Sequence, residues 1–176
     1  VRWLLTDSRS LSSPEVSLFF ALSTNKGDGH RYIPQLYQRG MRSFVVSQIP
    51  KGDYADAVFL QVPDTLKALQ QVAQSHRQQF DIPVIGITGS NGKTMVKEWL
   101  SQMLSPDHIV TRSPRSYNSQ IGVPLSVWNL NEKSEVGIFE AAISQPGEMA
   151  TLATIIQPTI GVFTGLGDAH QENFNS

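Results

Sequence analysis

Short apolar runs, separated by polar turns that contain glycine, occupy the first third of the chain. Such runs are typical of β-strands. Residues 32–39 have a helical pattern that stops at Gly40, a residue type that readily closes a helix in the left-handed conformation. The pattern predicts a small α/β domain. The expected strands are Trp3–Leu5, Leu18–Leu22, Ser43–Val46 and Ala57–Leu60.

A longer helix is expected over residues 64–79, where Asp64 can cap the first turn and an apolar stripe follows. Strand and helix patterns alternate beyond it, which favours a largely parallel sheet with helices on its faces. The fold class is therefore α/β, with a first domain over residues 1–80, linking helix included, and a second over residues 81–176. The stripe is Leu66, Leu69, Val72, Ala73 and His76; the expected strands are 84–88, 109–111, 136–140 and 159–164, and the expected helices are 94–104, 121–130 and 148–156.

Composition excludes several classes of function. The 176 residues are 40% hydrophobic and 16% charged, ordinary values for one or two globular domains. The net charge of −1, without long blocks of like charge, argues against nucleic-acid binding. The absence of cysteine excludes disulfides and thiol nucleophiles and fits a reducing cytoplasm. No apolar run approaches the roughly 18–20 residues of a membrane span, and no signal-peptide pattern is present, so we expect a cytoplasmic protein.

The strongest chemical signal is a glycine-rich turn between an apolar strand and a helix. Glycines let backbone N–H groups curl around phosphate oxygens, and the helix dipole favours negative charge there. Lys93 would reach the β- and γ-phosphates, and the Thr94 hydroxyl would bind Mg²⁺. Ile87 stands where the general phosphate-loop pattern has glycine, so an ordinary turn is the alternative; the strand–turn–helix context argues against it. The turn consists of Gly89, Ser90, Asn91, Gly92, Lys93 and Thr94.

The helix after this turn is expected to be amphipathic. Its apolar residues fall on one helical face, which we expect to pack on the sheet and anchor the turn. The face consists of Val96, Trp99, Leu100, Met103 and Leu104.

Two further residues are expected at the same edge of the sheet. Glu140 ends an apolar strand, and His170 follows the last expected strand and a glycine-rich turn. Ligands of open α/β sheets bind beyond the carboxyl ends of the strands, so both residues are candidate groups for Mg²⁺ or for positioning water. The alternatives are a surface or capping carboxylate and a histidine without a ligand role.

Several separated motifs together resemble the Mur ligases, which build the peptide stem of bacterial peptidoglycan. The resemblance covers nearly the whole chain and depends on the agreement of the motifs, since each alone is weak. The upstream motifs resemble the family's domain for the UDP end of the substrate. The motifs are Thr6-Asp-Ser-Arg9, Leu18-Phe-Phe-Ala-Leu22, Asp28-Gly-His30, Thr88–Thr94, Asn118-Ser-Gln-Ile-Gly-Val-Pro124, Glu140, Gly147-Glu148 and Gly167-Asp-Ala-His170.

The resemblance implies a role for each candidate residue. Lys93 and Thr94 would hold the ATP phosphates and a first Mg²⁺, Asn118 and Glu140 would lie beside the γ-phosphate and metal, and His170 would help to hold a second Mg²⁺. Two departures from the family pattern are Ser119 in place of a second asparagine and Gly165 in place of an asparagine. The residues implied near the UDP-sugar are Ser8, Arg9, Asn25, Asp28, Gly29 and His30.

Within the family, two segments resemble the D-alanyl-D-alanine-adding members more than the diaminopimelate- or lysine-adding members. They are the Ile-Gly-Val-Pro-Leu run from Ile121 and the Pro-Gly-Glu run ending at Glu148. The resemblance implies that ATP phosphorylates a carboxylate of UDP-N-acetylmuramoyl-tripeptide and that the amine of D-Ala-D-Ala attacks the acyl phosphate. A folylpolyglutamate synthase is the more distant alternative, and the N-terminal motifs argue against it.

The ends of the chain suggest a fragment of a longer protein. The chain begins at Val1 rather than Met and stops at Ser176, directly after the histidine motif. The family's amine-binding domain and carbamylated lysine would lie beyond Ser176, as would an alanine racemase fused to some members. We therefore expect the chain alone to be a nucleotide- or UDP-binding module without turnover.

Overall fold

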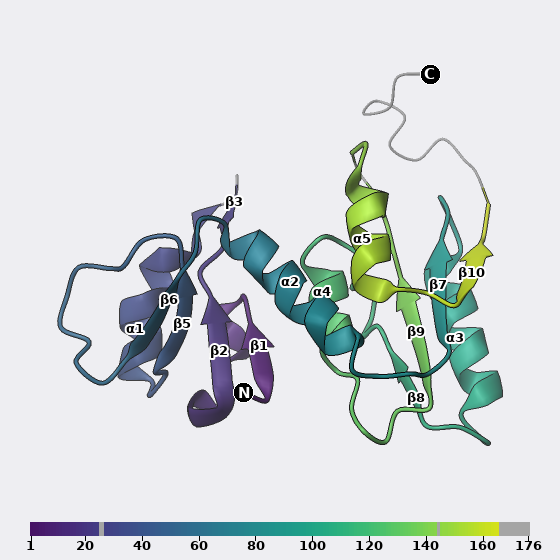
Figure 1. Ribbon diagram of the computed structural model, residues 1–176, viewed down its shortest axis with the longest axis horizontal. Coiled ribbons are helices and arrows are strands. Elements are labelled where there is room, and N and C mark those ends of the chain that lie inside the picture. The colour runs from purple at the N-terminus through teal and green to yellow at the C-terminus, as the bar shows by residue number, and fades with distance from the viewer. Residues whose placement is uncertain (25–26, 144, 166–176) are drawn as a thin grey trace. The chain divides into compact units, whose positions relative to one another are not determined.

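The computed structural model describes residues 1–24, 27–143 and 145–165 (Figure 1). The chain divides into two compact units, Val1–Leu69 and Gln70–Ser176. Each unit is built on its own four-stranded parallel sheet, which confirms the α/β class expected from the sequence. No helix in the described ranges is long and apolar enough to cross a membrane.

The first unit alternates short strands with turns. Its elements are β1 (Trp3–Leu5), η1 (Ser8–Ser10), η2 (Pro14–Val16), β2 (Ser17–Phe20), β3 (Ser23–Thr24), β4 (Gly27–Asp28), η3 (Gly29–Tyr32), α1 (Ile33–Gln38), β5 (Ser43–Val46) and β6 (Val58–Gln61), where η marks a 3₁₀ turn. The sheet order is β1-β2-β5-β6, and β3 and β4 form a separate antiparallel pair. Gly40 ends α1 with a φ of 92°, as expected from the sequence.

One hydrophobic core lies between this sheet and α1. Phe19 and Phe44 meet edge to face, with ring centroids 6.4 Å apart, and Ile33 and Leu36 bring α1 against them. All four side chains are fully buried. The core therefore fixes the end of β1, from which the turn at residues 6–10 emerges, and the start of α1, into which the turn at residues 28–30 leads.

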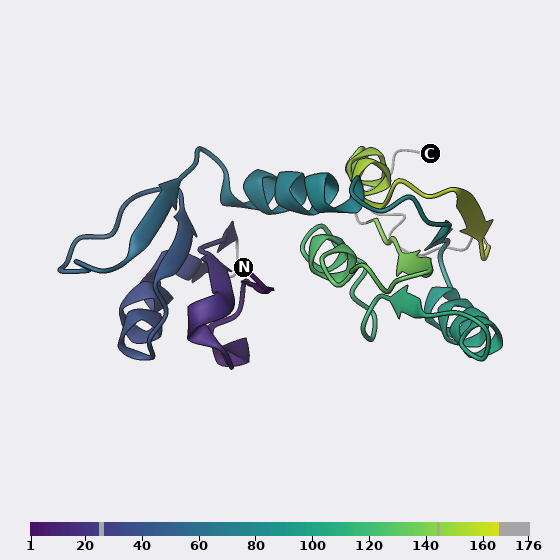
Figure 2. The same cartoon turned by 60° about the horizontal axis from the view of Figure 1, so that its bottom comes forward.

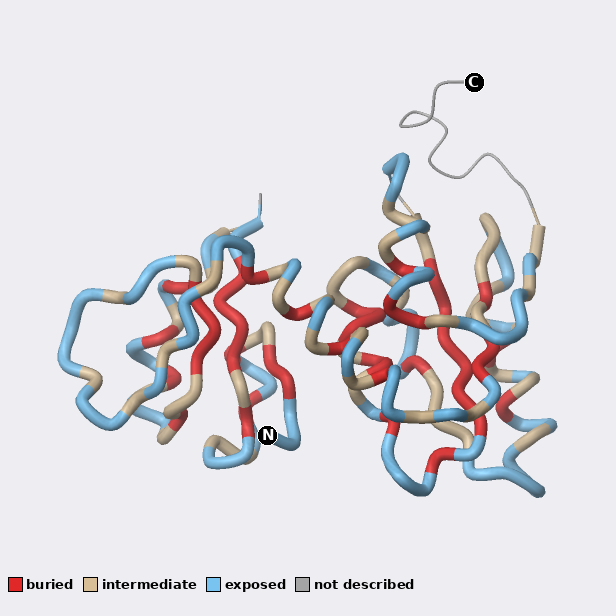
Figure 3. The backbone as a smooth tube through the Cα atoms, in the orientation of Figure 1, coloured by how far each residue is buried: buried red, intermediate tan, exposed pale blue. Residues whose placement is uncertain are grey.

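The second unit alternates strands and helices. With the connecting helix, its elements are α2 (Thr65–Arg77), β7 (Val84–Thr88), α3 (Lys93–Leu104), β8 (Val110–Arg112), α4 (Gly122–Val127), β9 (Val136–Glu140), α5 (Glu148–Ile156) and β10 (Ile160–Phe163). The sheet order is β10-β7-β9-β8. The central strand β9 is buried along its whole length (Figure 3).

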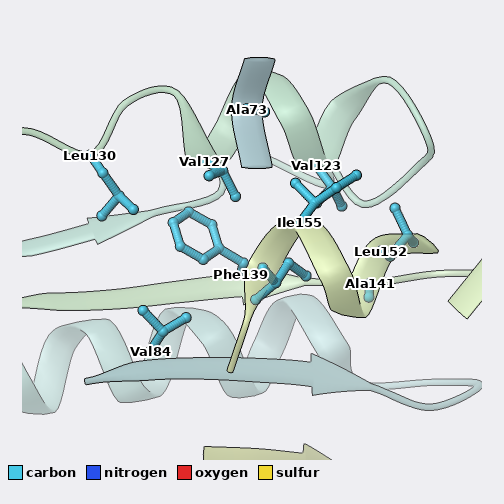
Figure 4. Close-up of a cluster of buried hydrophobic side chains, with 10 residues drawn as sticks. Ala73, Val84, Val123, Val127, Leu130, Phe139, Ala141, Leu152 and Ile155 are labelled. Atoms are coloured by element: carbon cyan, nitrogen blue, oxygen red, sulfur yellow. The ribbon is translucent and has the colours of Figure 1, made fainter. Parts of the chain in front are cut away.

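Helices cover both faces of the second sheet (Figure 2). On one face, Phe139 of β9 packs with Val123 and Val127 of α4 and Ile155 of α5 (Figure 4). On the other face, apolar residues of β7 and β9 pack against α3. Because successive strand residues point to opposite faces, each strand contributes to both cores.

Helix α3 presents a different face to the sheet from the one expected. Trp99 and Met103 are exposed, so their assignment to the buried face was wrong. Lys97 and Ser101 are buried in their place, beside Val96, Leu100 and Leu104, which do pack on the sheet. The buried face differs because the Lys97 ammonium pairs with the buried Glu140 carboxylate on the sheet. The pattern of apolar residues contains no signal for this pair.

Helix α2 begins as expected and ends with an unexpected buried charge. The Asp64 carboxylate accepts the Lys67 N–H at 3.0 Å, which caps the first turn. Arg77 is buried, and its guanidinium donates to the carbonyls of Ile156, Phe80 and Gln157. Burial lowers the pKa of this guanidinium. These hydrogen bonds anchor the connection after α5 to α2.

Candidate functional site

The glycine-rich turn lies at the carboxyl end of β7 and opens α3. Gly89 has a φ of 130° and Gly92 a φ of 81°, conformations that favour glycine. A Cβ on Gly89 would lie 2.3 Å from the Thr164 hydroxyl oxygen, so a side chain there would also collide. Gly92 carries no side chain to cap α3, which leaves the N–H groups of the first turn to an anionic ligand.

Lys93 folds back over the turn. Its ammonium donates to the Gly89 carbonyl at 2.5 Å and to the Ser90 carbonyl at 3.4 Å. Within the described ranges, no carboxylate forms an ion pair with Lys93. Its positive charge therefore lies beside the turn, available to a phosphate.

Glu140 is the buried acid of the site. Val136 and Ile138 point toward α3, and the alternation along β9 sends the Glu140 side chain to the same face. Its carboxylate is fully buried, and Oε2 accepts from the Thr94 hydroxyl at 3.1 Å and from the Asn118 amide at 3.4 Å. The structure thus brings together three sequence candidates from α3, β9 and the loop after β8.

Three polar residues that the sequence interpretation missed support this arrangement. The Lys97 ammonium lies 2.9 Å from Glu140 Oε1. The buried Ser113 hydroxyl accepts the Glu140 N–H at 3.2 Å. Thr164 donates to the Asn91 carbonyl at 2.5 Å and so attaches the end of β10 to the turn. No sequence pattern identified Lys97 as a partner of Glu140.

The residues present fit a magnesium ion. Within the described ranges, Glu140 Oε1 accepts no hydrogen bond and forms an ion pair with Lys97. Oε2 and the Thr94 hydroxyl are adjacent hard oxygen donors of the kind Mg²⁺ prefers. In that part of the chain no three His, Cys, Asp or Glu side chains cluster as metal ligands, so phosphate and water oxygens would complete the shell.

In the first unit, Ser8 and Arg9 lie in η1 after β1. Asp7 caps this turn through the Arg9 N–H at 2.9 Å, and the Arg9 guanidinium folds back on the same carboxylate at 2.6 Å. The hydrogen bonds from Arg9 lower the pKa of Asp7. Ser8 is buried, whereas the Arg9 side chain is 88% exposed and open to a ligand.

The Asp28–His30 turn is held by close backbone contacts. A Cβ on Gly29 would lie 2.8 Å from the Leu22 backbone nitrogen, so only glycine fits. Asp28 accepts the His30 N–H at 3.0 Å and contacts His30 Nδ1 at 2.6 Å. The backbone hydrogen bond from His30 is the main cause of a lowered Asp28 pKa. His30 Nε2 accepts the Ser47 N–H at 3.1 Å, so the buried ring ties the turn to the end of β5.

Two sequence candidates, Asn25 and His170, lie outside the described residues. The structure therefore places Ser8, Arg9 and the Asp28–His30 turn in the first unit and the glycine-rich turn, Asn118 and Glu140 in the second.

The second unit has the architecture of α/β proteins whose glycine-rich turn binds nucleotide phosphates at a helix N-terminus. Comparison with known families makes the assignment specific. The model of the Mur ligase middle domain matches residues 87–176, and that of the Mur ligase family, catalytic domain, matches residues 1–77. The chain belongs to the Mur ligase family, as the sequence motifs indicated.

Individual relatives agree with the family match. The UDP-N-acetylmuramoyl-tripeptide–D-alanyl-D-alanine ligase of Synechocystis is 40% identical over 95% of this chain and 36% of its own length. A crystal structure of MurF from Acinetobacter baumannii superposes with a TM-score of 0.90 at 30% identity, over 98% of this chain and 37% of that one. The structure of the MurF ligase of Thermotoga maritima in complex with ADP superposes with a TM-score of 0.83 at 28% identity. The match covers 96% of this chain and 38% of that one. This chain thus spans little more than a third of these relatives.

Proposed function

We propose that this chain forms the UDP-substrate and phosphate-binding part of an ATP-dependent ligase that adds D-Ala-D-Ala to UDP-N-acetylmuramoyl-tripeptide. The observation that carries the proposal is the meeting of the phosphate turn with Thr94, Asn118 and the buried Glu140. Relatives that match nearly the whole of this chain bear that ligase name, and one of the matching structures is a complex with ADP. The proposed substrates are small molecules of cell-wall synthesis, and we propose that the protein acts on them in the cytoplasm.

The proposed reaction proceeds through an acyl phosphate. The γ-phosphoryl group of ATP passes to a substrate carboxylate, the amine of D-Ala-D-Ala attacks the carbonyl carbon, and inorganic phosphate leaves. Lys93 and the N–H groups at the start of α3 would neutralise charge on the transferring phosphoryl. This stabilisation needs positioned charge rather than a protein nucleophile.

Magnesium would be held by Thr94 and Glu140, and His170 is proposed for a second ion. When bound, Mg²⁺ would neutralise phosphate charge and orient the phosphoryl oxygens. Asn118 would keep Glu140 Oε2 directed toward Thr94, since its amide donates to that oxygen. Burial strengthens these interactions because the local dielectric is low.

Replacing Lys93 tests the phosphate site directly. Lys93→Ala should weaken ATP binding roughly 10- to 100-fold or beyond detection, since a charge-assisted hydrogen bond contributes roughly 1.5–3 kcal/mol. Isothermal calorimetry with Mg·ATP measures the affinity, and circular dichroism checks the fold. Lys133→Ala, at an exposed position of the same unit, is the matched control and should bind as the wild type does. Unchanged affinity in Lys93→Ala would remove the basis of the proposal.

The first unit is proposed to bind the UDP end of the substrate through Ser8, Arg9, Asn25 and the Asp28–His30 turn. Arg9→Ala should weaken binding of UDP-N-acetylmuramoyl-tripeptide while ATP affinity stays unchanged, because the exposed guanidinium can reach a diphosphate. Competition between the tripeptide and dipeptide forms of the substrate separates the ligase types. Tighter binding of the dipeptide form would favour a diaminopimelate- or lysine-adding enzyme instead.

A further inference from the structure

Lys97 is a buried lysine behind the phosphate site. Its side chain has no solvent exposure, although it lies only one helical turn after Lys93. Its ammonium meets three acceptors: Glu140 Oε1 at 2.9 Å, Glu98 Oε1 at 3.3 Å and the Arg115 carbonyl. The contact with Arg115 is a hydrogen bond, and the two contacts with the carboxylates are ion pairs.

The contacts form a chain of alternating charges. Arg112 donates to Glu98 at 2.5 Å, Glu98 pairs with Lys97, and Lys97 pairs with Glu140. Arg112 and Glu98 are partly exposed, whereas Lys97 and Glu140 are fully buried. The Lys97 ammonium therefore compensates the negative charge of Glu140 at Oε1, whereas Thr94 contacts Oε2.

Lys97 also holds the loop that carries Asn118. The Arg115 carbonyl accepts from Lys97, and Arg115 has a φ of 50°, a strained conformation for a residue other than glycine. The next residue, Ser116, lies 3.4 Å from the Thr94 hydroxyl through its own hydroxyl. One ammonium thus joins α3, β9 and this loop.

The two oxygens of Glu140 consequently have different surroundings. Oε1 faces Lys97, and Oε2 faces Thr94 and Asn118. We propose that Lys97 is a positioning residue that occupies Oε1 and leaves Oε2 as the single oxygen with which Glu140 binds the magnesium of Mg·nucleotide. This inference rests on the proposed nucleotide site and adds to it a residue that does not touch the nucleotide.

The test compares ADP binding with excess Mg²⁺ and with EDTA in the 176-residue chain. The wild type should bind ADP more tightly with Mg²⁺, and the ratio of the two affinities is the magnesium gain. Lys97→Met keeps the length of the side chain and removes its charge. It should lower the magnesium gain about 10-fold, as loss of an outer-shell partner does at metal sites, with the EDTA affinity within about twofold of wild type.

A double-mutant cycle separates positioning from general structural damage. Glu140→Gln alone should lose the magnesium gain, and adding Lys97→Met to it should change the gain no further. Damage to the turn would instead weaken binding in EDTA as much as in Mg²⁺. A magnesium gain in Lys97→Met that equals or exceeds the wild-type value overturns the inference, and so does a proportional loss under both conditions.

Infrared difference spectra of the wild type provide a test that does not require Lys97→Met to fold. Adding Mg²⁺ to the ADP complex should widen the separation of the carboxylate stretching bands, as single-oxygen ligation does, and the change should vanish in Glu140→Gln. A narrowed separation would show two-oxygen ligation and overturn the inference. Absence of ADP binding by the wild type would instead overturn the proposed nucleotide site, so the two failures are distinguishable.

Discussion

Both units of this chain are built on a four-stranded parallel sheet, but they differ in how far their charged side chains are buried. Each has four parallel strands with polar candidate residues after the strand ends. In the first unit the charged candidates are open to water: the side chains of Arg9 and Asp28 are 88% and 49% exposed. In the second unit Lys97 and Glu140 are fully buried. Exposed pairs contribute little to stability, whereas a buried pair cannot lose one partner cheaply.

His30 shows how the first unit achieves order without buried charge. Its ring is buried, but Nε2 accepts the Ser47 N–H, so Nδ1 carries the ring proton and donates to Asp28. The buried imidazole of His30 thus has a hydrogen-bond partner at each of its two nitrogens. The first unit can therefore present charges to a ligand at a smaller cost in stability than the second.

The largest expected effect comes from breaking the buried pair. Lys97→Met should lower the free energy of unfolding of the second unit by about 3–5 kcal/mol, because Glu140 is left as an uncompensated buried charge. The double variant Lys97→Met with Glu140→Gln should recover most of this loss. Hydrogen exchange in increasing urea, followed on peptides from each unit, measures the two units separately.

The matched change in the first unit is Arg9→Met, which removes an exposed cation. It should leave the unfolding free energy of the first unit close to the wild-type value, because water screens an exposed ion pair. Equal losses in Lys97→Met and Arg9→Met would break the contrast between the two units.

An intermediate effect is expected at the glycine-rich turn. Gly89→Ala should destabilise the second unit by more than Gly147→Ala, although both glycines have positive φ values. At Gly147 a Cβ meets nothing within 4 Å, so its cost is the backbone strain of about 1–2 kcal/mol. At Gly89 the collision with Thr164 is added. Thermal melting of the two variants checks the order, and an equal shift would show that Thr164 moves aside freely.

The smallest effect concerns pH in the first unit. The pKa of Asp28 is lowered in the fold, so its ionised form contributes stability above the unfolded value of about 3.9, and this contribution disappears as pH falls through the lower folded value. The stability advantage of the wild type over Asp28→Asn should therefore be present at about pH 5 and shrink below about 4. Urea unfolding monitored in the first unit at several pH values measures it. An advantage independent of pH down to 3 would contradict the assignment.

The periodicity of the sequence was sufficient for the main strands and helices and for the α/β class, but it did not predict the antiparallel pair of β3 and β4. Alternating apolar runs and amphipathic stretches are local signals, and turn residues such as Gly40 mark where an element ends. The glycine-rich turn between a strand and a helix was also predicted, because its glycines, Lys93 and Thr94 are adjacent in the chain.

The face of α3 that is buried against the sheet could not be predicted from the periodicity. The expected apolar face included Trp99 and Met103, which are exposed, and excluded Lys97, which is buried. A lysine is buried only when a partner compensates its charge, and that partner, Glu140, lies on another element. Hydrophobic periodicity contains no information about such a partner.

The sequence by itself thus determined the main strands and helices, the fold class and the position of the glycine-rich turn, because each depends on residues that are neighbours in the chain. The tertiary structure alone decided how Glu140 is held. Its neighbours Thr94, Lys97, Ser113 and Asn118 come from α3 and from the loop after β8. These residues meet at the carboxylate because the pleat of β9 turns it toward α3, and burial there requires both a counter-charge and hydrogen bonds.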